Sequence, residues 1–224
     1  MVTWKGIDLN NKGIIVERTP TVQKEKKNIE IIEVEGRSGF LTIDNNTYSS
    51  FVVQVECHFD PQKFDIDEIK SFLDGVGAVS FDGEREYIAV IQNSISFEKV
   101  LRFKSFVIEF LCNPIAEEKT EHEVIVTQTD YTLSISDANV EMYPKLEITG
   151  TGDLSITINN KTFNILDADG TYYLDSKLKV ITHNNLNAAS SMQNDFPTLI
   201  PGENNISYLG NISSFKIKYR KAFL

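Results

Sequence analysis

Some side chains in this sequence are of types that can do chemistry, and their spacing decides which chemistry is open to them. The run Asp-Ala-Asp-Gly at 167–170 alternates two carboxylates before a glycine, an arrangement that can wrap a hard cation such as calcium. The calcium-loop pattern is incomplete, because the glycine comes two residues early and position twelve is Leu178 rather than glutamate. A hairpin turn between strands that end at Leu166 and begin at Tyr172 explains the run better. The sequence therefore predicts no metal site.

The candidate bases and nucleophiles are scattered along the chain. The histidines are His58, His122 and His183, and none belongs to a His-Glu-x-x-His pair. No Gly-x-Ser-x-Gly elbow or Walker-type phosphate loop is present. Cys57 and Cys112 lie inside apolar runs without zinc-ligand spacing, so they are predicted to be small buried hydrophobes. These patterns predict a protein that is not an enzyme and uses no cofactor.

Aromatic side chains offer a different chemistry, because the faces of Tyr and Trp can stack on pyranose rings. The candidates in the second half of the chain are Tyr131, Tyr143, Tyr172, Tyr173 and Tyr208. Within this set, Tyr172 and Tyr208 are the preferred glycan contacts. The competing explanation is that Tyr is common in strands, where the pair 172–173 places one ring on each face. Carbohydrate binding by the second half stands as an alternative function.

The elements that position these side chains are predicted to be mainly strands. Apolar residues occupy alternate positions from Phe51 to Phe59, as a strand with one face in a core requires. The runs 87–91 and 106–112 are apolar at most positions, which predicts strands buried on both faces. Turn-forming residues at 150–152 and 201–204 separate further runs. Short strands at this spacing predict an all-β protein of antiparallel sandwiches rather than βαβ units.

One segment departs from this period. Apolar residues at 66, 69, 72, 73 and 76 have the spacing of one stripe on a helix. Asp65 is suited to the N-terminal cap and Gly75 to the left-handed position after the C-terminus. The sequence predicts one short helix, at about residues 65–75.

A polar, charge-rich stretch at 117–123 indicates a junction between two domains, residues 1–118 and 119–224. The second domain contains about seven strand candidates, the density of a small β-sandwich. The first is predicted to be a β-sandwich that also contains the helix. Each is long enough to bury a core of its own.

The charge balance bears on partners. With 22 Lys and Arg against 32 Asp and Glu, the net charge is −10. This balance indicates no basic face for nucleic acid or for an anionic membrane surface. No apolar stretch approaches the ~18 residues of a spanning helix, and the N-terminus has no signal-peptide core. We therefore expect synthesis in a cytosol and no membrane partner.

Several turn-and-strand runs occur in a particular order. In the first half they are Gly36-Arg37-Ser38-Gly39, Tyr48, the strand 51–59, the helix end Phe72-Leu73, the strand 85–89 and the closing run 110–114. In the second half they are the runs 144–150, 173–176 and 196–204. Taken in order, these runs resemble the two domains of distal tail proteins (Dit) of long-tailed bacteriophages. The resemblance covers nearly the whole chain, although Phe72 stands where that family often has Trp.

The resemblance implies a structural role. Members of the family form a hexameric ring at the end of the tail tube, with N-terminal domains closing the ring and galectin-like C-terminal domains pointing outward. The implied partners are five further copies of the chain, the tail tube protein and a tail-tip or baseplate protein. DNA would pass through the central channel without specific binding, and the expected location is the tail tip of the virion. No insertion in the second half is large enough for a separate carbohydrate-binding module.

A ring requires each subunit to offer two different surfaces. The long segment Thr21–Asn46, polar at 23–28, is expected to form a protruding arm or hairpin that supplies one of them. The candidate ring-interface residues are Ile31, Val34, Arg37 and Phe40. We also expect Asp and Glu to outnumber Lys and Arg on the inner surface of the ring, where they would repel passing DNA.

Overall fold

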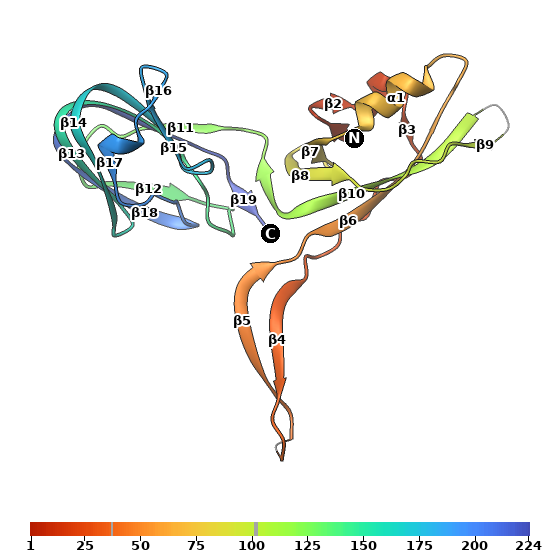
Figure 1. The fold of residues 1–224 in the computed structure, drawn as a ribbon, viewed down its shortest axis with the longest axis horizontal. Coiled ribbons are helices and arrows are strands. Elements are labelled where there is room, and N and C mark those ends of the chain that lie inside the picture. The colour runs from red at the N-terminus through yellow and green to blue at the C-terminus, as the bar shows by residue number, and fades with distance from the viewer. Residues whose placement is uncertain (37, 101–102) are drawn as a thin grey trace. The chain divides into compact units, whose positions relative to one another are not determined.

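The computed structural model describes residues 1–36, 38–100 and 103–224 and divides into two compact units (Figure 1). Unit 1 comprises Met1–Ala116 with Leu224, and unit 2 comprises Glu117–Phe223. The boundary expected from the sequence, between residues 118 and 119, lies close to this division. Both units consist mainly of antiparallel strands, which confirms the all-β fold class. Among the described residues, no helix is long and apolar enough to cross a membrane.

Unit 1 is built around one antiparallel sheet with the order β2-β1-β7-β8-β10-β6-β3. Its elements are β1 (Thr3–Trp4), β2 (Ile7–Asp8), a 3-10 turn (Leu9–Lys12), β3 (Ile15–Val16), β4 (Lys27–Glu33), β5 (Phe40–Tyr48), β6 (Phe51–Phe59), α1 (Ile66–Leu73), β7 (Val76–Ser80), β8 (Arg85–Ile91), β9 (Glu98–Val100) and β10 (Phe103–Glu118). Strand β9 pairs with β10, and β4 pairs with β5 in a separate two-stranded sheet.

The core of unit 1 follows from the alternation in β6. Val53, Val55, Cys57 and Phe59 are buried, while the residues between them face away from this core. Trp4 is fully buried against Phe110, with ring centroids 5.2 Å apart. The apolar side of the sheet and the apolar stripe of the helix therefore share one core.

The helix α1 lies where the sequence predicts it. It begins after Asp65, whose carboxylate accepts a hydrogen bond from the backbone N–H of Asp67 at 2.9 Å. Ile69 and Leu73 point into the core, and Gly75 adopts φ +83° after the last turn. The indole N–H of Trp4 donates to the carbonyl of Phe72 at 3.1 Å, which fixes the end of α1 to β1.

One prediction for unit 1 is wrong. The apolar runs 87–91 and 106–112 form β8 and part of β10, but these strands are buried on one face only. On the other face, Ile88 is 41% and Val107 is 38% exposed. Among the described residues of unit 1, the core packs on one side of this sheet, and Val52, Ile88 and Val107 are exposed on the opposite side. We call this side, with Val52, Ile88 and Val107, the open sheet face.

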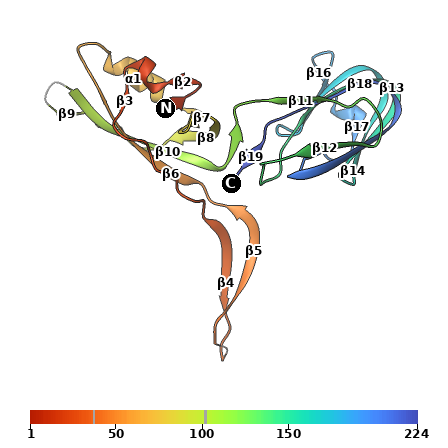
Figure 2. The ribbon, with the colours of Figure 1, turned by 180° about the vertical axis from the view of Figure 1, so that it is seen from behind.

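Unit 2 is a second antiparallel sheet system with the order β11-β18-β13-β14-β15-β16, in which β12 also pairs with β18 and β17 with β14. Its elements are β11 (His122–Ile125), β12 (Tyr131–Ile135), β13 (Lys145–Ile158), β14 (Lys161–Asp175), β15 (Val180–His183), β16 (Leu186–Asn187), a 3-10 turn (Ala189–Ser191), β17 (Met192–Gln193), β18 (Gly202–Tyr219) and β19 (Ala222–Phe223). Figure 2 shows the long strands β13, β14 and β18 curving around the core of this unit.

Two predicted turns in unit 2 are absent at their expected places. Strand β13 continues through residues 150–152, and β14 continues through 167–170, so the predicted hairpin between Leu166 and Tyr172 is wrong. The register between β13 and β14 shifts between Gly152 and Leu154, which marks a bulge. Bulges and turns favour the same residues, because both need positive φ or close backbone approach. A Cβ atom on Gly150 would lie 2.7 Å from the carbonyl oxygen of Asn211 on β18.

Candidate functional site

The segment expected to form an arm is a β-hairpin. Strands β4 and β5 pair antiparallel with each other, and among the described residues no other strand joins their two-stranded sheet (Figures 1 and 2). We call residues 27–48 the arm. The chain reverses between the two strands near Gly36 and Gly39, both of which have positive φ.

The base of the arm is held by polar contacts. The ammonium of Lys27 pairs with the carboxylate of Asp44, and this pair raises the pKa of the lysine and lowers that of the carboxyl. Asn28 donates from its side-chain amide to the hydroxyl of Thr47 at 3.0 Å and accepts from the hydroxyl of Ser49 at 2.6 Å. These contacts fix the register of the strands where they leave the unit.

Both faces of the arm carry exposed apolar side chains. Cross-strand partners share a face, so the pairs Ile31–Thr42 and Glu33–Phe40 lie on one side. The pairs Glu30–Ile43 and Ile32–Leu41 lie on the other side. The exposed apolar residues of the arm are Ile29, Ile31, Ile32, Val34, Phe40, Leu41 and Ile43. An isolated two-stranded hairpin is only marginally stable in water, so an arm of this composition is suited to being covered by another surface.

Among the ring-interface candidates, Ile31 and Phe40 lie near one another on the same face of the arm and are 61% and 63% exposed. Val34, which follows β4, is also exposed. Arg37 lies outside the described residues.

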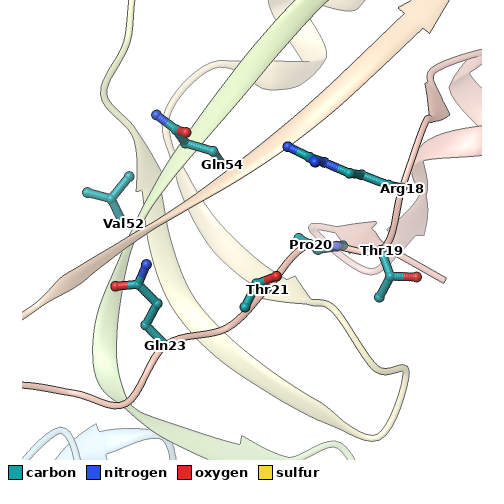
Figure 3. A pocket seen from close by; sticks show the side chains of 7 residues that line it. All are labelled: Arg18, Thr19, Pro20, Thr21, Gln23, Val52 and Gln54. Atoms are coloured by element: carbon teal, nitrogen blue, oxygen red, sulfur yellow. The ribbon is translucent and has the colours of Figure 1, made fainter.

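A groove of about 490 Å³ lies beside the open sheet face, between β6 and the segment that leads into the arm (Figure 3). Its lining residues are Arg18, Thr19, Pro20, Thr21, Gln23, Val52 and Gln54. Arg18 stands at the start of this segment and forms an ion pair with Glu56 of β6 at 2.7 Å. Unit 1 therefore carries two different surfaces, an apolar arm and a sheet face bordered by a groove. A closed ring of identical subunits needs two such unlike surfaces.

The tyrosine candidates for glycan contact occupy different environments. Tyr172 is only 3% exposed and stacks on His183 with ring centroids 4.5 Å apart, so its ring offers no open face to a sugar. Its burial, with the nearby Asp169 carboxylate, raises the pKa of its hydroxyl. Tyr208 is partly buried, with its ring perpendicular to that of Phe215. The rings that are open to solvent are those of Tyr143 and Tyr173, which the sequence does not distinguish from the others.

The three histidines belong to three separate ion pairs. Each has its own carboxylate: His58 with Glu17 at 3.4 Å, His122 with Glu118 at 2.8 Å, and His183 with Asp169 at 3.1 Å. Among the residues that the structure describes, no group of three or more His, Cys, Asp or Glu side chains could hold a metal ion.

Both cysteines are buried, as predicted. Burial raises the pKa of each thiol, Cys57 and Cys112, to about 12, so neither is a nucleophile near neutral pH.

Comparisons with known proteins identify the fold. No protein-family model matches the sequence, and no curated protein matches it significantly. The crystal structure of the SPP1 Dit (gp 19.1) protein, described as a paradigm of the hub adsorption apparatus in phages that infect Gram-positive bacteria, is similar over 100% of this chain and 98% of its own. The TM-score is 0.78 and the sequence identity is 14%. The resemblance to Dit proteins is confirmed for the fold of both units.

Proposed function

We propose that the chain is a structural hub at the tip of a phage tail. The observation that carries this proposal is the similarity to SPP1 Dit over the full length of both chains, since that protein belongs to a hub adsorption apparatus. A match restricted to one β-sandwich would support the proposal far less, because β-sandwich domains serve many functions. In this role the protein joins the tail tube to a tail-tip or baseplate protein and has no catalytic activity of its own.

The finer proposal is a hexameric ring closed by unit 1, with unit 2, the domain expected to be galectin-like, at the periphery. The arm supports it, because its apolar side chains are exposed on both faces. The open sheet face and its groove offer the second, unlike surface that ring closure needs. We assign Ile31, Val34, Arg37 and Phe40 to the contact between neighbouring subunits.

The channel of such a ring would pass DNA without binding it. The net charge of −10 supports this, since a surface with excess carboxylates repels phosphates. We expect Asp and Glu to outnumber Lys and Arg on the inner surface. A basic inner surface would contradict this part of the proposal.

Native mass measurement of the full chain at micromolar concentration tests the ring. We expect a species of six subunits, or its formation when the tail-tip partner is added. A chain that stays monomeric both alone and with the tail-tip partner would overturn the proposed ring.

A further inference from the structure

A shallow hollow of about 310 Å³ lies on the outward face of the sheet in unit 2. Tyr173 of β14 stands in it with half of its side chain exposed. Its cross-strand neighbours are Glu147 on β13 and Thr182 on β15, so the three side chains share this face of the sheet. The exposed side chains of Leu178 and Val180 border the hollow.

The next row across the same face is charged. Lys145 lies opposite both Asp175 on β14 and Lys218 on β18. The ammonium of Lys145 is 4.0 Å from the carboxylate of Asp175. Asp175 also accepts hydrogen bonds at 3.0 Å from the backbone N–H groups of Lys177 and Leu178. These contacts hold the turn between β14 and β15 against the hollow.

The charges that line the hollow balance. Lys145 and Lys218 contribute positive charge, and Glu147 and Asp175 contribute negative charge. Beside them, Lys216 pairs with Glu147 at 3.0 Å, and this contact raises the pKa of the lysine. Such a site attracts neither an anion nor a cation strongly, but it presents both donors and acceptors of hydrogen bonds around an aromatic ring.

We propose that this hollow binds a neutral pyranoside, with the ring of Tyr173 stacked on the apolar face of the sugar. The flanking Lys145, Glu147 and Asp175 would donate to and accept from its hydroxyl groups. The volume of about 310 Å³ is at the lower end of the range for small-molecule sites. This function goes beyond the hub, because it involves unit 2 alone and does not depend on ring formation.

The test is saturation-transfer NMR on the full chain with methyl glycosides of glucose, galactose and N-acetylglucosamine, each at millimolar concentration. We expect transfer to at least one of them, strongest at the ring protons of one sugar face. The Tyr173→Ala variant should bind about tenfold more weakly, whereas Tyr173→Phe, which keeps the ring, should still bind.

Tyr143→Ala is the matched control, because Tyr143 is also exposed in unit 2 but does not line the hollow. It should bind as the unaltered chain does. A circular dichroism spectrum and melting temperature measured on every variant separate loss of binding from loss of fold. No transfer to any of the three glycosides, or equal transfer with Tyr173→Ala, would overturn the proposed site and leave the hub proposal unaffected.

Discussion

Replacing Ile31 and Phe40 together by serine should block assembly without destabilising the subunit. In the single chain these side chains are already 61% and 63% exposed, so their loss removes little buried surface. We expect the free energy of unfolding to change by at most about 0.5 kcal/mol, as for other surface substitutions. The arm contributes mainly to contacts with other molecules under this account.

The effect on assembly can be estimated from the same exposure. Burying a large apolar side chain completely is worth ~1.5–3 kcal/mol, so covering the exposed three fifths or so of each contributes ~1–2 kcal/mol. The Ile31→Ser/Phe40→Ser variant should therefore weaken each contact between neighbouring subunits by ~2–4 kcal/mol, a ~30- to 1,000-fold loss of affinity. Because a ring repeats this contact between each pair of neighbours, the same loss of affinity applies at every interface.

Sedimentation velocity over a concentration series measures this effect. Leu209→Ser is the matched control, since Leu209 is also an exposed apolar residue of a strand but belongs to β18 of unit 2 rather than to the arm. Under the conditions in which the unaltered chain assembles, alone or with the tail-tip partner, we expect the control to assemble equally well and the arm variant to stay monomeric at the same concentrations. Normal assembly of the arm variant would refute the assignment of the arm to the interface, and a melting temperature lowered by many degrees would refute its exposure in the subunit.

Three further outcomes follow from buried groups. Leu73→Ala should destabilise unit 1 by ~2–5 kcal/mol, because Leu73 of α1 is buried in the core. Denaturation followed by the fluorescence of Trp4, the one tryptophan of the chain, measures this change, and an unchanged midpoint would show that α1 is not packed on the sheet. Asn204→Leu should lower the free energy of unfolding of unit 2 by ~2–4 kcal/mol, because the buried amide accepts a hydrogen bond from the N–H of Ile200 and donates one to its carbonyl. Denaturation followed by near-ultraviolet circular dichroism measures this change, and an unchanged stability would contradict those hydrogen bonds. Cys57 and Cys112 should resist thiol reagents at pH 8 in the folded chain, and rapid labelling of the native chain would contradict their burial. Because burial raises the pKa of both thiols from 9.0 to about 12, the free energy of unfolding should fall as the pH rises above 9.

Local patterns in the sequence predict much of unit 1. The alternation from Phe51 to Phe59 identifies β6, and the cap at Asp65 with the apolar stripe of α1 identifies the helix. These signals depend on neighbouring residues, so one segment contains all the information needed. The open sheet face is different, because whether Ile88 is covered depends on elements far away in the sequence.

The misassigned turns in unit 2 have a related cause. Glycine at 150 and 152, and the Asp-rich run at 167–170, are typical of tight turns, yet here they shape bulges inside β13 and β14. The distinction requires the register of the paired strands, which no single segment contains.

The candidate sites also differ in how far the sequence predicts them. The long segment that becomes the arm is visible in the sequence from its length and polar start. Tyr173 cannot be separated from Tyr172 by sequence, since adjacent residues on a strand differ in which side of the sheet they face, and only the sheet shows which side is covered.

Imaging of the tail tip by electron cryomicroscopy tests the hub proposal most directly. We expect six copies of this chain around the tail axis, directly below the tube, with each arm in contact with the neighbouring copy. A tail tip in which the chain is absent, or lies away from the tube axis as separate copies, would contradict the account.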